Sequence, residues 1–552
     1  MRLINATTMQ LEYFMADPPP YAILSHTWED DEVTFQDFTD PNRAVTSTKK
    51  GFAKIQLACQ LAKQASIAYA WVDTCCIDKT SSAELTEAIN SMFAWYAESA
   101  VCYVFLSDIG AADAIDPLEP TPEFAASRWF TRGWTLQELI APKVVEFYDQ
   151  EWTLRGTKGG LAKVLETITR IDGQVLRDSS VLADIPVARR MSWAATRVTT
   201  RVEDTAYCLL GIFDISMPML YGEGKKAFIR LQEEIAKETN DLTLFAWQAR
   251  DAGVQKYRGV LATSPAEFLN ANSIIVGDDK RFSDEFDMTN KGLRINSWLG
   301  TGPGESTVRT LNCSLREDPT QQIGIYLTMH GASLYARSQP DKFLLQSQSE
   351  LARQPNSRIL QTQQMSGKAD TIYISKSLTP SRSVSLDKAR QYGFLFRSGY
   401  ISPLFKAHMI QPLDLWDSHQ RAFLAQGVVS FTGVIFFSIK DAYVRSHRIS
   451  GGSFLLACGI TAGKEEGEKR PWICIGSSLG NNELVKAWGA GARSINEVSD
   501  VGSRSENKSI ALVDSSRKEQ IIISVEMEEA VIDGVSMYCI DIKFEDLAAR
   551  GK

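Results

Sequence analysis

The fold is decided by the stretch Ser127-Arg-Trp-Phe-Thr-Arg-Gly-Trp-Thr-Leu-Gln-Glu-Leu-Ile-Ala-Pro-Lys-Val-Val-Glu-Phe-Tyr-Asp149. Its first part predicts an amphipathic helix that ends at Ala141, because the residue before Pro142 is driven out of helical geometry. A short β-branched and aromatic strand follows at once. Trp134 and Glu138 are four residues apart, so a helix places an aromatic ring beside a carboxylate on one face. Such a carboxylate is usually just solvated, and its role depends on the segments around it.

Strands alternate with helices on either side of this stretch. The expected strands are Tyr21–Trp28, Ile67–Asp73, Ala100–Leu106 and Lys143–Tyr148. Two helices are expected between these strands. The first is predicted by four apolar residues at helical spacing, Phe52, Ile55, Cys59 and Ala62. The second is predicted by the capping box Ser81-Ser-Ala-Glu84 at its start. The alternation predicts right-handed βαβ units and a flavodoxin-like parallel sheet flanked by helices.

A ligand of an open parallel sheet binds beyond the carboxyl ends of the strands, where the strand order reverses. For the strand order 2-1-3-4-5, this crevice lies between the first and third strands. The side chains expected to reach it are Ser25, His26 and Trp28 from the first strand, Asp73 and Cys76 from the loop after the second, Ser107 from the end of the third, and Trp134 and Glu138 from the following helix. Separate segments are thus expected to form one pocket.

We therefore expect three parts: an α/β domain at residues 1–155, a helical extension packed on it at residues 156–247, and a β-rich domain at residues 248–552. In the extension we expect a second capping box at Thr200-Arg-Val-Glu203, a helix C-cap at Gly211 and a turn at Gly222-Glu-Gly224. One further helix buries a stripe of apolar residues, namely Phe228, Leu231 and Ile235.

Beyond residue 250 the chain changes to short apolar runs separated by turn residues. The clearest runs are Ile323–Thr328, Thr371–Ser375, Gly433–Phe437, Ser453–Ala457, Gln520–Val525 and Met537–Ile542. Their spacing predicts an antiparallel sandwich or barrel. The polar stretches 340–368 and 492–518 are expected to be loops.

Composition narrows the class of protein and its partners. The 552 residues are 44% hydrophobic and 23% charged with a net charge of -8, which argues against nucleic acid as the main partner. The odd number of cysteines, nine, most of them within apolar runs, favours reduced, buried thiols of an intracellular protein. The N-terminus lacks a signal-peptide core, and the most apolar run, Val428–Ile439, is too short to cross a bilayer. We therefore expect a cytoplasmic protein without a membrane span.

Metal and thiol chemistry are weaker interpretations of the same residues. His26 is the only histidine among the first 329 residues, which argues against a multi-histidine zinc site there. Adjacent Cys75 and Cys76 are poorly spaced for chelation. A nucleophilic triad of Cys76, His26 and Asp73 remains an alternative, but it requires those side chains to meet in space.

Four ordered blocks resemble the fungal heterokaryon-incompatibility (HET) domain. They are Tyr21-Ala-Ile-Leu-Ser-His-Thr-Trp28, Tyr69-Ala-Trp-Val-Asp-Thr-Cys-Cys-Ile-Asp78, Ser91-Met-Phe-Ala-Trp-Tyr-Ala97 and Arg132-Gly-Trp-Thr-Leu-Gln-Glu138. The segments Arg201–Gly211 and Tyr221–Gly224 are similar to what commonly follows this domain. The resemblance implies a role in non-self recognition and programmed cell death.

It also implies remote kinship with Toll/interleukin receptor (TIR) domains, several of which cleave NAD+. Glu138 matches the position of their catalytic glutamate, whereas Thr135 stands where TIR domains commonly have cysteine. The resemblance thus implies NAD+ as a substrate, no cofactor, homo-oligomerisation on activation and a C-terminal domain that controls activity or binds a protein partner. A non-catalytic assembly module and a sensor that binds a nucleotide without cleaving it remain the alternatives.

Overall fold

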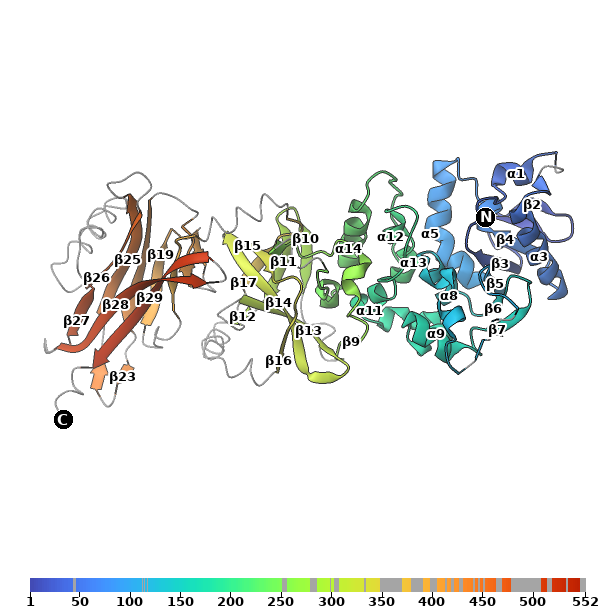
Figure 1. Ribbon diagram of the computed structural model, residues 1–552. Coiled ribbons are helices and arrows are strands. Elements are labelled where there is room, and N and C mark those ends of the chain that lie inside the picture. The colour runs from blue at the N-terminus through green and yellow to red at the C-terminus, as the bar shows by residue number, and fades with distance from the viewer. Residues whose placement is uncertain are drawn as a thin grey trace. The chain divides into compact units, whose positions relative to one another are not determined.

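The computed structural model describes most of the chain (Figure 1). The described residues are 1–42, 46–111, 113, 115–116, 118–250, 256–277, 285–297, 299–301, 307–331, 334–347, 370–378, 391–397, 405–412, 415–417, 421–425, 430–439, 442–444, 447–449, 452–462, 469–477, 508–513, 519–532 and 535–546. The chain forms two compact units. The first comprises Met1–Arg250, Leu261–Ser283 and Asn312–Pro319, and the second comprises Asp251–Val260, Asp284–Leu311 and Thr320–Lys552.

A mixed sheet of seven strands forms the centre of the first unit, in the order β2-β1-β4-β3-β5-β6-β7. The four predicted strands are confirmed and pair in parallel as β3 (Tyr21–His26), β4 (Tyr69–Val72), β5 (Val101–Phe105) and β6 (Val145–Tyr148). Strands β3 and β5 are buried along their whole length, as their apolar sequences require. The sequence did not predict the antiparallel strands β1 (Arg2–Asn5), β2 (Gln10–Tyr13) and β7 (Leu154–Thr157), of which β2 and β7 form the two edges of the sheet.

The two predicted helices between these strands are present as α3 (Lys50–Gln64) and α5 (Ser82–Glu98). The sequence did not predict α1 (Phe35–Thr39) and α6 (Pro122–Ala125), and the loop expected after the second strand begins with the short helix α4 (Asp73–Cys76). Helix α3 buries all four residues of its predicted stripe. The capping box of α5 is only half formed: Ser81 accepts the Glu84 N–H at 3.4 Å, but the Glu84 carboxylate accepts the Asp78 N–H at 2.8 Å instead of that of Ser81.

The single helix predicted before Pro142 is wrong, because the chain forms two short helices, α7 (Arg128–Thr131) and α8 (Thr135–Ile140). The break lies where the chain meets a distant segment: Arg132 bridges Val198, and the Gly133 N–H donates to the Val198 carbonyl at 2.9 Å. A Cβ on Gly133 would lie 2.5 Å from a Thr199 methyl group, so glycine permits this approach. Trp134 therefore directly precedes α8 rather than lying within a longer helix.

The predicted helical region follows the sheet. Its elements are α9 (Ala162–Thr169), α10 (Gly173–Arg177), η1 (Ser179–Asp184), α11 (Val187–Ser192), α12 (Asp204–Tyr207), α13 (Leu210–Phe213), α14 (Lys226–Glu238) and η2 (Leu242–Phe245). The short helix η3 (Pro265–Phe268) lies beyond it, in the part predicted to be β-rich. Helix α14 buries its predicted stripe. The turn at Gly222–Gly224 is confirmed, with φ of 105° and 58° at its glycines.

Two predicted caps in this region are wrong. The Glu203 carboxylate does not cap a helix but accepts the N–H groups of Gly222 and Gly224 at 2.8 and 3.0 Å, because the later turn folds back onto it. Gly211 lies inside α13 instead of ending a helix. A Cβ built there would be 2.0 Å from the Phe93 Cβ of α5, so glycine allows these two helices to pack closely.

Replacing Gly211 with alanine is expected to lower the free energy of unfolding by about 2 kcal/mol, because the clash with Phe93 outweighs the helix preference of alanine, about 1 kcal/mol. Urea unfolding followed by circular dichroism measures the change. Gly159→Ala is the matched control, since no atom lies within 4 Å of its added Cβ. Equal stability of the two variants would contradict close packing of α13 on α5.

The remaining described chain is strand-rich. One sheet has the order β10-β11-β17-β15-β14-β13-β12, with β16 on β14, β8 on β15 and β9 on β13. Its strands are β8 (Tyr257–Arg258), β9 (Ile274–Ile275), β10 (Phe286–Thr289), β11 (Gly292–Ser297), β12 (Gly300–Thr301), β13 (Thr307–Leu315), β14 (Asp318–Gly331), β15 (Leu334–Ser338), β16 (Leu344–Ser347) and β17 (Asp370–Ile374).

Two further sheets have the orders β20-β21-β18-β29-β28-β27 and β19-β22-β25-β26, and β23 pairs with β24. Their strands are β18 (Phe394–Phe396), β19 (Phe405–Gln411), β20 (Trp416–Asp417), β21 (Ala422–Phe423), β22 (Phe431–Ile439), β23 (Ala442–Val444), β24 (His447–Ile449), β25 (Gly452–Ala462), β26 (Lys469–Ser477), β27 (Ser509–Val513), β28 (Glu519–Ile532) and β29 (Val535–Asp546). All six predicted apolar runs fall in strands, and most pairings are antiparallel, apart from β15–β17 and β18–β29.

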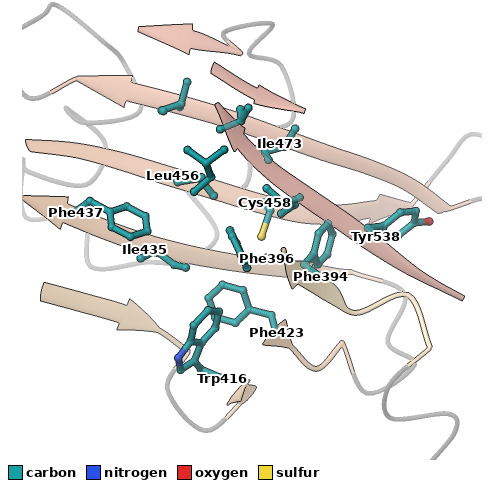
Figure 2. Packing of buried hydrophobic residues seen from close by; sticks show 14 of the residues in the cluster. Phe394, Phe396, Trp416, Phe423, Ile435, Phe437, Leu456, Cys458, Ile473 and Tyr538 are labelled. Carbon is teal, nitrogen blue, oxygen red and sulfur yellow. The ribbon is translucent and has the colours of Figure 1, made fainter. Parts of the chain in front are cut away.

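These two sheets share one hydrophobic core (Figure 2). On β25 the core residues Phe454, Leu456, Cys458 and Ile460 alternate along the strand, as one face of a sheet requires. From the other sheet, Phe394, Phe396 and Tyr538 contribute their rings. All nine cysteines are free and buried, as predicted.

The polar stretches expected to be loops are only partly described. Residues 348–368, 492–507 and 514–518 lie outside the described residues, whereas β16 and β27 occupy parts of what remains, so the prediction of continuous loops is wrong there. None of the described helices combines the length and apolar character needed to cross a bilayer.

Candidate functional site

A cavity of about 280 Å³ lies beyond the carboxyl ends of β3 and β4. Helices α5 and α8 and residues 200–221 supply the rest of its wall. Its lining residues are Leu24, His26, Trp28, Asp73, Ile77, Lys79, Leu85, Ile89, Met92, Tyr96, Arg132, Trp134, Thr135, Glu138, Thr200, Arg201, Asp204 and Tyr221. Strand β5 supplies none of them, so the pocket lies on the β4 side of β3 and not in the predicted crevice between β3 and β5.

Glu138 is held in this cavity by a chain of hydrogen bonds. The Ser25 hydroxyl at the end of β3 donates to the Glu138 carboxylate, and the buried Trp129 Nε1–H donates to the Ser25 Oγ at 2.8 Å. Because Ser25 and Trp129 are both buried, the carboxyl group has little freedom to rotate away. The side chain of Glu138 is itself only partly exposed.

Burial raises the pKa of Glu138 to about 8. Hydrogen bonds from Ser25 and Tyr96 and the charge of Arg132 oppose this shift, whereas the negative charge of Asp73 adds to it. Burial therefore favours the protonated, neutral form of the Glu138 carboxyl group at pH 7. A ligand that brings positive charge would favour its ionisation.

Trp28 and Asp73 form a second group in the wall. The Trp28 Nε1–H donates to the Asp73 carboxylate at 3.0 Å, so the two side chains orient each other. The Lys79 ammonium lies 3.6 Å from the centroid of the Trp28 ring and 3.9 Å from Asp73. An exposed aromatic face, an acid and a cation thus share one side of the cavity.

His26 lines the cavity from the end of β3 but is almost fully buried. Its Nε2 lies 3.6 Å from Glu32, whose carboxylate also pairs with Lys54. Burial would raise the pKa of Glu32, but His26 and Lys54 together lower it to about 2. His26 therefore belongs to a charged cluster behind the cavity wall as well as to the wall itself.

The helical region closes the cavity opposite α5. The Tyr221 hydroxyl donates to Asp204 at 3.0 Å, and the Arg201 guanidinium lies 4.4 Å from the centroid of the Tyr221 ring. Burial raises the pKa of Asp204, although hydrogen bonds from Tyr221 and Trp134 oppose the shift. Arg132 donates to Thr200 at 3.3 Å and so connects α7–α8 to this wall.

The heterokaryon incompatibility protein (HET) family model matches residues 21–118, which include β3, β4, α5 and β5. Residues 21–118 are therefore similar to the HET domain. Over 225 residues the chain is 48% identical to the vegetative incompatibility protein HET-E-1 of Podospora anserina. That alignment covers 40% of this chain and 16% of the relative, so the chain spans about one sixth of the length of the curated relative it matches.

The fold brings five of the predicted site residues to the cavity: His26, Trp28, Asp73, Trp134 and Glu138. The first three lie within the matched residues 21–118. The other three do not line it. Ser25 lies behind Glu138 and acts on the cavity only through that carboxylate. Cys76 is buried with its sulfur against the Val72 N–H, so the alternative triad with His26 and Asp73 does not form at the cavity. Ser107 donates to Glu29 at 3.1 Å, because the end of β5 turns away from this cavity.

Sequence reasoning missed several lining residues of the HET domain and its extension, namely Lys79, Tyr96, Arg132, Arg201, Asp204 and Tyr221. A signal existed for the last three, since the segments that contain them resemble the sequence that commonly follows a HET domain. Tyr96 lies on α5, and Leu85, Ile89 and Met92 of the same helix also line the cavity. Among the described residues, no group of three His, Cys, Asp or Glu side chains is arranged to hold a metal ion.

Replacing Lys158 with methionine is expected to destabilise the HET domain by about 2 kcal/mol, because three carbonyls at the end of the Glu138 helix lose a buried donor. Its ammonium donates to the carbonyls of Leu139 and Ile140 at 3.1 and 3.3 Å and to that of Pro142. Thermal unfolding measures the effect, with Lys163→Met on the exposed face of α9 as the control. A Lys158→Met variant as stable as the control would show that water replaces the donor at no cost.

Proposed function

We propose that this protein is a cytosolic cell-death effector of fungal non-self recognition, and that its HET domain hydrolyses NAD+ to nicotinamide and ADP-ribose. The observation that carries the proposal is the position of Glu138, held by Ser25 in a cavity whose walls include the Trp28 and Trp134 rings. The resemblance to the TIR domain and its catalytic glutamate supports the same role. The vegetative incompatibility protein that the chain resembles supports the biological setting.

The residues suit cleavage of the bond between nicotinamide and ribose. When this C–N bond breaks, its electron pair moves to the pyridinium nitrogen, and the ribose carbon becomes an oxocarbenium-like cation. An ionised Glu138 beside the ribose stabilises that cation. Water then adds to the ribose carbon and releases a proton, which completes the hydrolysis.

The cationic nicotinamide ring would counteract the high pKa of Glu138. Burial favours the neutral acid, whereas the positive ring of NAD+ lowers the pKa and favours the carboxylate. Binding therefore prepares the charge that the transition state needs. A group that ionises only with its substrate present avoids keeping an unpaired buried charge in the resting protein.

The test is to incubate the purified full chain with NAD+ and to separate the products by chromatography. We expect equal amounts of nicotinamide and ADP-ribose. We also propose that activation involves self-association, so the assay is run from dilute to concentrated protein and the specific activity is expected to rise. Absence of nicotinamide release at every concentration, including conditions in which the chain oligomerises, would contradict the proposal.

A non-catalytic assembly module is the second candidate, and one observation favours it: burial favours the neutral form of the Glu138 carboxyl group at pH 7. On this interpretation Glu138 helps to shape a surface, and the β-rich domain recognises a protein partner. Expression in fungal cells distinguishes the candidates. Cell death that persists with Glu138→Gln while cellular NAD+ stays constant favours the assembly module.

A further inference from the structure

Two arginines in the cavity wall, Arg132 and Arg201, are not in ion-pair contact with a carboxylate, although the charge of Arg132 acts on Glu138 and that of Arg201 on Asp204. Among the described residues, neither Arg132 nor Arg201 forms an ion pair with a carboxylate, whereas Lys79 and Asp73 lie within ion-pair distance of each other. The Arg132 guanidinium reaches only the Thr200 hydroxyl, and that of Arg201 lies over the Tyr221 ring. Unpaired guanidinium groups beside a cavity favour an anionic ligand, because phosphate accepts their parallel N–H groups.

The two arginines belong to the same wall. Arg132 contacts Thr200, which directly precedes Arg201, and all three residues line the cavity. The nearby carboxyl group of Asp204 is occupied by the Tyr221 hydroxyl. The cavity thus has acidic groups at Asp73 and Glu138, and it has two arginines where residues 132 and 200–201 meet.

The size of the cavity limits what it can enclose. A volume of about 280 Å³ is at the lower end for small-molecule sites. A whole dinucleotide, with two bases, two riboses and two phosphates, exceeds such a space. One base with its ribose is a better match, and the phosphate attached to that ribose would then lie at the wall.

Resting on the proposed function, we infer that Arg132 and Arg201 form a subsite for the 5′-phosphate of the nicotinamide ribose. The ligand class is then the pyridine mononucleotide, free or as half of NAD+, and adenosine contributes little to binding. The positive ring faces the acidic groups and the phosphate faces the arginines. Both residues lie outside the 21–118 family match, and Arg201 belongs to the helical extension, so the extension would help to determine the substrate.

Binding of three ligands tests the inference directly. The full chain carrying Glu138→Gln, which limits turnover, is titrated calorimetrically with NAD+, nicotinamide mononucleotide and nicotinamide riboside. We expect the mononucleotide to bind within about 3-fold of NAD+ and the riboside, which lacks the phosphate, to bind at least about 30-fold more weakly.

Arginine variants in the same background locate the subsite. Arg132→Gln and Arg201→Gln are each expected to weaken mononucleotide binding by about 10-fold and to leave riboside binding unchanged. Arg177→Gln, which removes an exposed arginine of α10 outside the cavity, is the matched control. If the arginines were only structural, each substitution would weaken the binding of the mononucleotide and of the riboside equally. Circular dichroism checks that each variant is folded.

The outcomes separate this inference from the proposed function. Mononucleotide binding that depends on the arginines, without nicotinamide release by the wild-type chain, supports the subsite and overturns NAD+ hydrolysis. Equal release of nicotinamide from riboside and mononucleotide supports hydrolysis and overturns the subsite. Failure of all three ligands to bind overturns the subsite as well.

Discussion

Replacing Glu138 with glutamine is expected to slow nicotinamide release from NAD+ by about 100-fold to 1,000-fold, which is the usual cost of removing one preorganised electrostatic group. Glutamine has nearly the same shape and still offers an oxygen to the Ser25 hydroxyl, so the cavity keeps its form. Only the negative charge opposite the developing ribose cation is lost. The loss is therefore expected in kcat, with a smaller change in KM.

The rate is measured by chromatography of nicotinamide under saturating NAD+. Glu87→Gln, on the exposed side of α5, is the control and is expected to retain wild-type activity. For the wild-type chain, kcat/KM is expected to rise with pH up to about 8, because the free protein must lose the Glu138 proton. Wild-type activity in Glu138→Gln would remove this residue from the mechanism.

Replacing Glu138 with glutamine is also expected to stabilise the protein at pH 8, by about 3 kcal/mol. This figure is smaller than the free energy that corresponds to the full pKa shift, because the Glu138 side chain is partly exposed. The sign follows from the raised pKa. Below its unfolded pKa of about 4.5, Glu138 is neutral in both states and costs nothing. As the pH rises towards the folded pKa of about 8, Glu138 ionises in the unfolded chain but stays protonated in the folded protein. The free energy of unfolding of the wild-type chain therefore falls.

Urea unfolding at pH 5 and pH 8 measures this effect without any assumption about catalysis. The advantage of Glu138→Gln over the wild-type chain is expected to fall below about 1 kcal/mol at pH 5. Glu87→Gln provides the baseline, since its carboxylate is exposed in the folded protein. An advantage that is equal at both pH values would mean that Glu138 is not held in a buried, neutral form.

The parallel strands were predictable because each is a continuous apolar run, and burial on both faces of a sheet requires such runs. The edge strand β2, Gln10–Tyr13, carries no comparable signal, because half of it is exposed and it depends on pairing with β1. The break between α7 and α8 was hidden for a similar reason. It depends on the contact between Gly133 and Val198, which are far apart in sequence.

The same distinction applies to the site. His26, Trp28 and Asp73 were predictable because they follow buried strands, and the ends of parallel strands meet at one edge. Arg201 and Tyr221 reach the cavity from the helical region that follows the sheet. No local sequence pattern predicts where that region packs against the sheet. Ser107 was predicted to line the cavity but instead donates to Glu29. The strand order predicts which strands are neighbours, but not the direction in which the chain leaves β5.

The position of Lys79 over Trp28 has a consequence for entry into the cavity. A positive ring that stacks on the same face of this indole must displace the Lys79 ammonium, which lies 3.6 Å from the ring centroid. On the proposed function, binding at that face exchanges one cation for another, and the displaced lysine remains near Asp73. An uncharged base would displace the ammonium without replacing its charge, so this face would favour a cationic ligand over a neutral one.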